Sequence, residues 1–419
     1  MKHVRDTERR ERIKYALREA DMAAVVCALP TQVLLLSGYW PVVGTALAVA
    51  TREGKIVVLA PEDERELAEE GWADTVDTFR PGSLDVLTGA VQAVCVLLAR
   101  MARGLGINGG LVGYESGAVF EPASYAALHL YGADMVGILR QAFPSVSLVP
   151  ADAMLAQLRA VKTSHEVQAI RRACRIAQRA FLQGANQLRA GLREPEAAAL
   201  FRAPLSTIGT DSKDIARADG FTFCMSGAYS AAAHGAYARS RINKIITRQE
   251  FALVHCNSYA DGYWTDITRT YCLGQADARK RAMYAAVFEA RRAALDAIRP
   301  GVKATEVDRA ARAVLTAHRF GERFKHSTGH GVGFAAIDHN ARPRLHPQSD
   351  DTLEVGMVFN VEPAIYIDGY GGLRHCDVVA ITENGVEVLT PFQLEPEQLI
   401  FDDPREAAIG MPMDRDAGA

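Results

Sequence analysis

The sequence lacks most of the features that mark secreted, membrane-spanning or nucleic-acid-binding proteins. Its seven cysteines include no Cys-x-x-Cys pair, which favours a reduced, cytoplasmic protein over a disulfide framework. No apolar run approaches the roughly 20 residues of a membrane helix, and the densely charged start from Met1 to Lys14 predicts no signal peptide. The net charge of −3 gives no broad attraction to nucleic acid or anionic membranes. We therefore expect a cytoplasmic protein without nucleic-acid or membrane partners.

The remaining composition is that of an ordinary globular protein. Hydrophobic residues make up 49% and charged residues 23% of the 419 positions, and this length suggests two or three domains. Helical and strand patterns alternate over residues 1–155, which predicts an N-terminal α/β domain. Its predicted strands are 23–28, 33–36, 45–50, 55–59 and 111–114, and its predicted helices are 7–20, 62–70, 84–103 and 122–130.

The N-terminal domain shows no catalytic constellation. Its isolated acids Glu115 and Asp134 are expected at the surface. Beyond it, Ser164 is a plausible cap for a long helix that runs to about Leu188. We place a second domain at 156–395 and a tail at 396–419, whose last ~15 residues should add nothing to the core.

The second domain contains a faint internal repeat with an offset of about 110 residues. Each copy has a pair of helices, a segment with a histidine, an apolar strand and a turn with the sequence Asp-Gly-Tyr. The histidines are His234 and His339, and the turns begin at Asp261 and Asp368. Two copies at this length predict a pseudo-symmetric α+β domain rather than a solenoid.

The first turn predicts a hairpin that brings two polar side chains together. Asp-Gly favours a tight turn, so His255 and Asp266, on opposite arms, could point into one pocket. A histidine and a carboxylate in such a pocket suit a metal site or proton transfer, while a surface hairpin is the simpler alternative. If the two copies of the repeat face each other, the partners of this pair fall near Glu362 and Cys376.

Two neighbouring segments add to this group. His330 lies between glycines that let the backbone pass close to a bound ion or substrate. Glu362 ends an apolar strand, and a buried acid usually has a partner or a ligand. Strand alternation should turn His375 away from Cys376, and Cys256 away from His255.

Several of these motifs together resemble the pita-bread metallohydrolases, which include prolidase, aminopeptidase P, methionine aminopeptidase and creatinase. The matching motifs are Gly-His-Gly-Val-Gly around His330, the strand with Glu362-Pro363, the run Asp-Ile-Thr-Arg-Thr from Asp266, and the helix start at Glu166. The resemblance covers roughly residues 10–395 and is strongest for the creatinase/prolidase branch. It implies an α+β chain, in which an N-terminal α/β creatinase-type domain precedes a pseudo-two-fold pita-bread catalytic domain, and a homodimer.

The resemblance also implies a set of metal ligands with two departures. The family's hydrolases hold two divalent ions with Asp, Asp, His, Glu and Glu. Those positions fall here on His255, Asp266, His330, Glu362 and Cys376. An uncharged imidazole thus replaces the first acid, and a thiol, which favours Zn²⁺ over Mn²⁺, replaces the bridging one. One ion (Zn, Mn or Fe), two ions and no ion all stay open.

The substrate-side residues follow from the same resemblance. His234 and His339 match histidines that hydrogen-bond the scissile group and move protons, and Glu362 matches the general base. His339 lies two residues further from His330 than is usual in the family. Three more residues match positions that support the site or face the substrate: His326, Tyr366 and Arg374.

These matches imply a metallohydrolase of the Xaa-Pro peptidase or creatinase type. It would cleave a C–N bond in a dipeptide, imide or other small amide or amidine with water activated by a metal ion. One alternative is a metal-independent, creatinase-like amidinohydrolase or a lyase on a small zwitterion, with His234 as the base. The other is a non-catalytic binding module, although such a module has little reason to keep these histidines and acids in compatible order.

Overall fold

The computed structural model describes residues 5–42, 46–80, 90–116, 133–210, 215–235 and 239–401. The chain divides into two compact units, Met1–His165 and Glu166–Ala419. None of the helices in the described ranges is long and apolar enough to cross a membrane. The predicted helix 122–130 and the last residues of the predicted tail lie outside the described residues.

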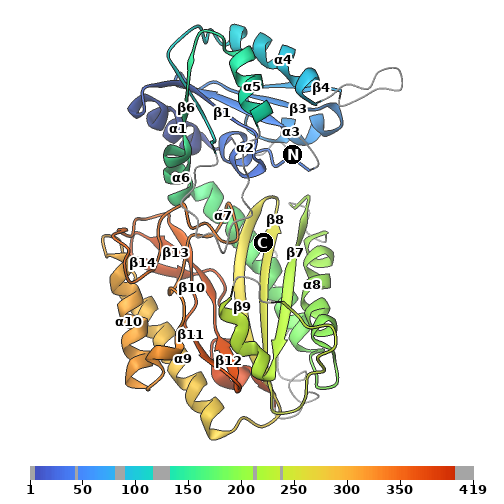
Figure 1. Ribbon diagram of the computed structural model, residues 1–419, viewed down its shortest axis with the longest axis vertical. Coiled ribbons are helices and arrows are strands. Elements are labelled where there is room, and N and C mark those ends of the chain that lie inside the picture. Colours follow the sequence, from blue (N-terminus) through green and yellow to red (C-terminus); the bar gives the residue numbers. More distant parts are fainter. Residues whose placement is uncertain are drawn as a thin grey trace. The chain divides into compact units, whose positions relative to one another are not determined.

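The first unit is built on one six-stranded sheet with the order β4-β3-β2-β1-β5-β6. Its strands are β1 (Met22–Cys27), β2 (Leu47–Thr51), β3 (Ile56–Pro61), β4 (Thr75–Phe79), β5 (Leu111–Tyr114) and β6 (Ser147–Pro150). Its helices are α1 (Thr7–Glu19), α2 (Pro30–Ser37), α3 (Arg65–Glu70), α4 (Ala90–Gly104), α5 (Ala133–Ala142) and α6 (Asp152–Ala160). Helices α4 and α5 pack on one face of the sheet, and α1 and α2 pack against its strands from the other (Figure 1). This is the α/β layering that the alternating pattern predicted.

Two predictions for the first unit are wrong. Residues 33–36 were expected to form a strand but belong to α2, which starts at Pro30 and is capped after Ser37 by Gly38, with a left-handed φ of 73°. Because α2 is buried almost all round, its apolar run carries no helical period. Glu115 was expected at the surface but is 1% exposed, since its carboxylate accepts backbone hydrogen bonds from Ala28 and, at 2.7 Å, from Leu29. The side chain of Asp134 lies outside the described residues.

The second unit has a central layer of strands flanked by helices. The helices are α7 (Ser164–Ala185), α8 (Glu194–Thr210), α9 (Ala278–Ala297) and α10 (Ala304–Ala317). One sheet has the order β15-β9-β8-β7, a second β10-β13-β14, and a third β11-β12. The strands are β7 (Ala218–Ser226), β8 (Phe251–Ala260), β9 (Tyr263–Leu273), β10 (Val358–Val361), β11 (Ala364–Ile367), β12 (Gly371–Arg374), β13 (Asp377–Thr382), β14 (Gly385–Val388) and β15 (Ile400–Phe401).

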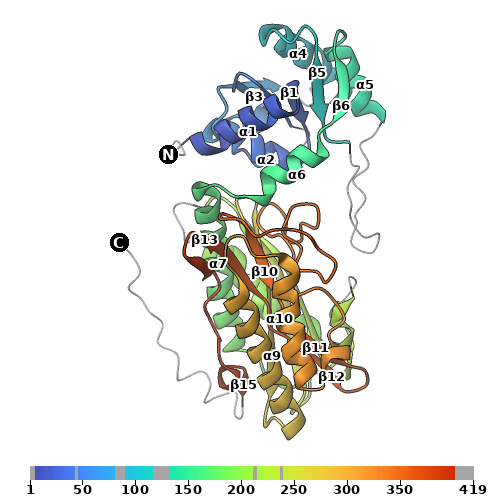
Figure 2. The ribbon, with the colours of Figure 1, turned by 90° about the vertical axis from the view of Figure 1, so that its left-hand side faces the viewer.

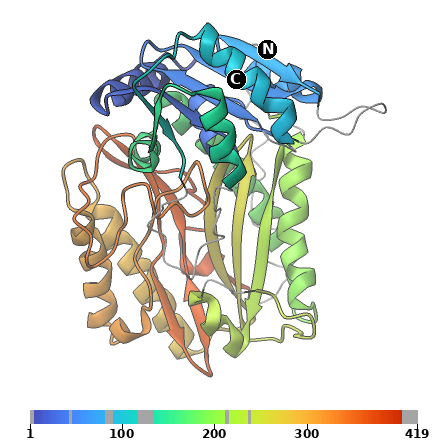
Figure 3. The ribbon, with the colours of Figure 1, turned by 45° about the horizontal axis from the view of Figure 1, so that its top comes forward.

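The internal repeat is visible in the order of these elements. The pair α7–α8 precedes the hairpin β8–β9, and the pair α9–α10 precedes the hairpin β11–β12. Asp261 and Gly262, with φ values of 48° and 83°, make the tight turn that the Asp-Gly dipeptide predicted. In Figure 1, α8 lies on one side of the strands and α9 with α10 on the other, and Figure 2 shows α9 and α10 running side by side. Figure 3 shows the two halves next to each other, green to yellow for the first and orange to red for the second.

The two halves are joined along β9. The backbone N–H of Cys376 donates to the carbonyl of Thr268 at 3.0 Å, and the hydroxyl of Thr270 donates to the carbonyl of Arg374 at 2.9 Å. The junction between β12 and β13 therefore runs directly beside the strand that carries Asp266. Further along the same edge of β9, Ile400 pairs in parallel with Cys272, so the start of the predicted tail adds a short strand.

Candidate metal centre

The first half contributes two of the predicted ligands from one face of a hairpin. The register pairs His255 with Thr268 and Asn257 with Asp266, so all four side chains project to the same side. The Nδ1 atom of His255 lies 3.4 Å from Oδ1 of Asp266 and 2.9 Å from Oγ1 of Thr268. The predicted proximity of His255 and Asp266 is thus present in the structure.

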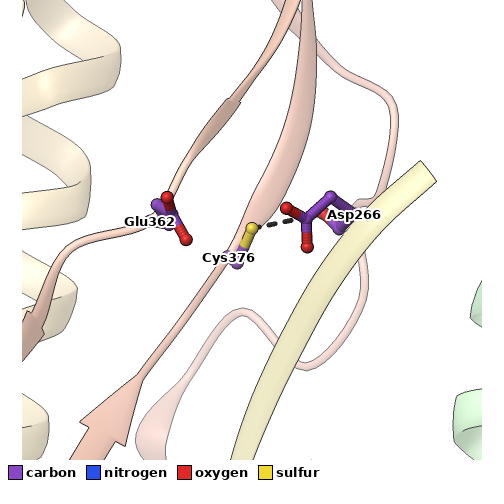
Figure 4. Close-up of side chains that lie close together, drawn as sticks. All are labelled: Asp266, Glu362 and Cys376. Carbon is purple, nitrogen blue, oxygen red and sulfur yellow. Dashed lines mark hydrogen bonds between the residues drawn. The ribbon is translucent and has the colours of Figure 1, made fainter. Parts of the chain in front are cut away.

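The second half brings two more predicted ligands to the same place. Glu362 lies between β10 and β11, and Cys376 lies between β12 and β13. A ligand atom from each of Asp266, Glu362 and Cys376 falls within 4.8 Å of the others, and all three residues are buried (Figure 4). The thiol of Cys376 donates to the backbone carbonyl of Asp266 at 3.2 Å, the contact drawn in Figure 4.

His330 joins the cluster from the loop that follows α10. Its Nε2 atom lies 3.2 Å from Oδ2 of Asp266 and 3.8 Å from Oε1 of Glu362. The loop reaches this position only because residue 329 is glycine, since a Cβ there would lie 1.9 Å from the backbone oxygen of Asn360. The glycine before His330 therefore allows the loop to pack against β10.

Sequence reasoning missed one residue at the centre of the cluster. The side-chain amide nitrogen of Asn360 lies 3.2 Å from Oδ2 of Asp266, 3.1 Å from Nε2 of His330 and 3.5 Å from Sγ of Cys376. A single polar residue in the otherwise apolar strand β10 was the signal that could have found it.

Three more of the predicted residues lie near Glu362: Arg374, Tyr366 and His326. The guanidinium of Arg374 is 3.8 Å from the Glu362 carboxylate and donates from Nε to Thr268 Oγ1 at 3.0 Å. Nδ1 of His326 lies 2.8 Å from a backbone carbonyl and must carry the proton of that bond. Its Nε2 therefore accepts from the hydroxyl of Tyr366, 2.9 Å away.

The two substrate-side histidines lie against this group of side chains. The ring of His339 meets the ring of His330 edge-on, with centroids 5.2 Å apart. The ring of His234 meets that of Tyr366 with centroids 5.5 Å apart, and His234 is exposed to solvent. Every residue predicted for the site thus lies in or next to one cluster.

Burial and neighbouring charges shift the titration of the acids in opposite directions. Burial raises the pKa of Glu362 to about 7, a rise that Asp266 reinforces and that Arg374 and His330 oppose. Burial would also raise the pKa of Asp266, but His255 and His330 outweigh it and lower that pKa. The cluster therefore contains one firmly ionised carboxylate and one that titrates near neutral pH.

The two departures from the family's ligands remove charge from the cluster. Burial lowers the pKa of His255 to about 4, and burial together with the nearby acids raises the pKa of the Cys376 thiol. Without an ion, both side chains are uncharged at neutral pH. The pair of carboxylates found at these positions in the family would carry two negative charges instead.

The donor atoms nevertheless fit a divalent cation. Oδ1 of Asp266 accepts no hydrogen bond from any residue that the structure describes, although Asp266 is 1% exposed. A buried carboxylate oxygen without a donor is costly unless a cation compensates it. Carboxylates, an imidazole and a thiol are ligands that Zn²⁺ and similar ions take in proteins, and Asp266, Glu362, His330 and Cys376 would hold such an ion.

Comparison with known sequences gives two matches that together identify the family. A model of the metallopeptidase family M24 matches residues 168–383. The chain is 30% identical over 388 residues to an Xaa-Pro dipeptidase of Pyrococcus furiosus, covering 93% of this chain and 99% of that protein.

Solved structures give the same result for the fold. The prolidase from Pyrococcus furiosus superposes with a TM-score of 0.70 at 28% identity, over 91% of this chain and 99% of that one. An Xaa-Pro dipeptidase from Bacillus anthracis superposes with a TM-score of 0.75 at 24% identity, over 92% and 97%. The chain therefore belongs to the metallopeptidase family M24, and it has the pita-bread fold of the prolidase branch.

Proposed function

We propose that this protein is a hydrolase that cleaves the C–N bond of an Xaa-Pro dipeptide or a related small amide, with one divalent ion in the site. The observation that carries the proposal is the buried oxygen Oδ1 of Asp266, which accepts no hydrogen bond from the described residues, beside Glu362 and Cys376. A site of this kind costs stability unless a ligand compensates it, and buried acids with shifted pKa values are typical of catalytic centres.

Asp266, His330, Glu362 and Cys376 are the residues that would hold the ion. A bound divalent ion supplies a Lewis acid that polarises a carbonyl and lowers the pKa of water. The thiol favours zinc over manganese. His255 contributes at most one nitrogen, through the Nδ1 atom that faces Asp266 and Thr268.

Glu362 is suited to the role of general base. Its carboxyl has a pKa near 7, so it can accept a proton from water and release it again within the same pH range. The guanidinium of Arg374 lies 3.8 Å from its Oε2 atom and is itself fixed by Thr268. This contact orients the carboxylate and limits how far its pKa rises.

The histidines next to the cluster are suited to the leaving group. Burial lowers the pKa of His339 to about 4 and lowers that of His234, so both are neutral at pH 7 and can donate one N–H while accepting elsewhere. A neutral imidazole that donates to a carbonyl oxygen or an amide nitrogen stabilises the charge that develops during attack. Tyr366, whose hydroxyl donates to His326, packs against the ring of His234.

The first test is to measure metal content and turnover on the same purified protein. We expect bound metal, hydrolysis of an Xaa-Pro dipeptide, and loss of that activity after chelation with recovery when metal is returned. Glu387→Gln is a matched control for Glu362→Gln, because Glu387 is half-exposed and pairs with Arg171 away from the cluster. A protein that binds metal but hydrolyses neither dipeptides nor other small amides would contradict the proposal.

A metal-free amidinohydrolase or lyase is the second candidate. It is favoured by the exposure of His234, a neutral imidazole that solvent and substrate can both reach. Turnover of creatine or another small zwitterion that persists in chelator and is lost in His234→Ala would support this candidate over the first.

A second test reverses the two departures from the family's ligands. The double change His255→Asp with Cys376→Glu should raise dipeptidase activity if the native site is adapted to a different C–N substrate. An unchanged or lower activity toward dipeptides, with metal still bound, would argue that these two positions do not set the substrate.

A further inference from the structure

Glu194 is a buried carboxylate outside the metal cluster, and both of its oxygens hold backbone groups. It is the first residue of α8 and is 0% exposed. Its Oε1 atom accepts the backbone N–H of Ser226 at 2.7 Å and the hydroxyl of the same residue at 2.9 Å. Its Oε2 atom accepts the backbone N–H of Arg241 at 2.6 Å. One side chain thus joins the start of α8 to two other parts of the chain.

These two parts flank the segment that carries His234. Ser226 is the last residue of β7 and directly precedes the short 3₁₀ helix Gly227–His234, while Arg241 follows this helix in the chain. The guanidinium of Arg241 also lies over the ring of Tyr229, 3.5 Å from the ring centre. The carboxylate therefore fixes the entry to the helix and, on the other side, the residue whose side chain covers it.

The same helix packs against β12, next to the metal cluster. The hydroxyl of Ser230 donates to the carbonyl of Gly227 at 2.6 Å and accepts the backbone N–H of Gly372 at 2.7 Å. A Cβ at residue 372 would lie 2.3 Å from the backbone oxygen of Ser230, so only glycine allows this contact. His234 is the last residue of the helix and meets the ring of Tyr366. Movement at the ends of the segment would therefore displace the imidazole from Tyr366.

The second half of the domain holds its own histidine segment in the same way. Asp308 lies in α10, which is the second helix of its pair as α8 is of the first, and is 1% exposed. Its Oδ1 atom accepts the backbone N–H of Thr328 at 3.1 Å and the hydroxyl of the same residue at 2.8 Å. In each half, a buried acid thus binds both donors of a residue that precedes a histidine of the site, His234 or His330.

We propose that Glu194 is a positioning residue for His234, because its two oxygens hold the two ends of the His234 segment and so keep the imidazole beside Tyr366. Glu194 acts through Ser226 and Arg241. A carboxylate is needed rather than an amide, since each of its oxygens accepts from a backbone N–H. The inference rests on the role that the proposed function gives to His234.

The first test is hydrogen exchange in Glu194→Gln, measured by mass spectrometry without any substrate. Glutamine keeps the size of the side chain, but its NH₂ group must face one of the two backbone N–H donors. Loss of one buried hydrogen bond should speed exchange in residues 227–235 by about 10-fold and leave residues 263–273 unchanged. A wild-type exchange rate in residues 227–235 would overturn the inference.

Asp308→Asn is the matched control. It places an NH₂ group in the other buried acid position, where the carboxylate accepts from Arg312 as well as from Thr328. We expect faster exchange around Thr328 and a wild-type rate in residues 227–235. An equal acceleration of residues 227–235 in both variants would mean that the whole domain loosens, and would count against a specific role of Glu194.

The second test separates positioning of His234 from a general loss of activity. We expect kcat to fall by roughly 10- to 100-fold in Glu194→Gln. The double variant Glu194→Gln with His234→Ala should be no slower than His234→Ala alone, because the carboxylate serves catalysis only through that histidine. If the two losses multiply instead, Glu194 acts on another part of the site and the inference is wrong.

Ser226→Ala keeps the inference testable if Glu194→Gln does not fold. It removes only the hydroxyl that donates to Oε1, so we expect a smaller increase of exchange in the same residues. A wild-type rate there would overturn the inference. A protein that hydrolyses no C–N substrate would contradict the proposed function instead, while the exchange rates still decide whether Glu194 holds the His234 segment.

Discussion

Two buried acid clusters lie on opposite faces of β9, and they are built in opposite ways. Behind the strand, Asp377 accepts from Arg269 and Arg291 at 2.6 Å each and from Thr390 at 2.9 Å. Burial would raise its pKa, but Arg269, His375 and Arg291 outweigh burial and hold that pKa well below its usual value. In front of the strand, Asp266 keeps one oxygen without a hydrogen-bond donor from the described residues.

The comparison distinguishes a buried acid that serves the structure, Asp377, from one that is suited to function, Asp266. The cluster around Asp377 supplies its own cations, and both carboxylate oxygens of Asp377 accept hydrogen bonds. The cluster around Asp266 contains acids, histidines and a thiol. The guanidinium of Arg374 approaches it at Glu362, where the two groups are 3.8 Å apart. A buried group of acids with so little compensating charge stabilises a bound ion at the expense of the ion-free protein.

The largest expected effect is the loss of turnover in Glu362→Gln. Removing a general base lowers kcat by about 10²- to 10⁴-fold. The same change should leave the free energy of unfolding unchanged or raised, because it removes a carboxylate that burial disfavours. Steady-state kinetics and urea unfolding measure the two quantities. Equal activity in Glu362→Gln and the control Glu387→Gln would remove Glu362 from the mechanism.

The next effect compares the two aspartates directly. Asp377→Ala leaves Arg269 and Arg291 buried without their partner and should lower the free energy of unfolding by about 3–5 kcal/mol. Asp266→Ala in the metal-free protein should lower the free energy of unfolding far less, because His330 can become neutral when its acidic neighbour is removed. Urea titration of both variants checks this order. A larger loss in Asp266→Ala would mean that the front cluster is structural as well.

A smaller effect is expected from Thr268→Val. The hydroxyl of Thr268 joins Arg374 to His255, and its loss leaves buried donors unpaired at a cost of about 1–3 kcal/mol. Thr265→Val is the matched control, because it removes a buried hydroxyl that pairs with Ser258 on the opposite face of β9. Both variants should lose stability, but only Thr268→Val should also lower kcat. A similar fall in kcat for both would point to a general effect of the strand.

A last effect is the dependence of stability on pH in the metal-free protein. Glu362 has a pKa near 7 in the folded state, against an ordinary value of 4.5, so the folded protein holds its proton more tightly. Its contribution to stability is therefore complete below pH 4.5 and is lost as the pH rises through 7. The wild type should show this decline relative to Glu362→Gln when unfolding is measured across that range. Parallel curves would mean that the carboxyl titrates normally.

The sequence was most informative where a motif and its register act locally. The Asp-Gly turn predicted the hairpin and, through strand alternation, the shared face of His255 and Asp266. Alternation also predicted that His375 turns away from Cys376, and His375 indeed lies 3.4 Å from Asp377 in the rear cluster. The internal repeat predicted that Glu362 and Cys376 would meet the first hairpin, which requires only that the two copies face each other.

Predictions failed where burial depends on a partner distant in the chain. Glu115 looked like a surface acid because nothing near it in sequence shows that its carboxylate accepts the backbone N–H groups of residues 28 and 29. The apolar run 33–36 has no period because α2 is covered on nearly all sides. In both places the neighbours that decide the outcome lie elsewhere in the fold.

The sequence by itself determined the family, the order of elements and which residue types reach the site, because these follow from motifs and local periodicity. Only the tertiary structure decided which buried acid is compensated and which is not. It also placed the amide of Asn360, a polar residue in an apolar strand, against Asp266, His330 and Cys376. The amide is oriented by the backbone of His330, thirty positions earlier in the chain, and that contact exists only when the loop before β10 packs onto it.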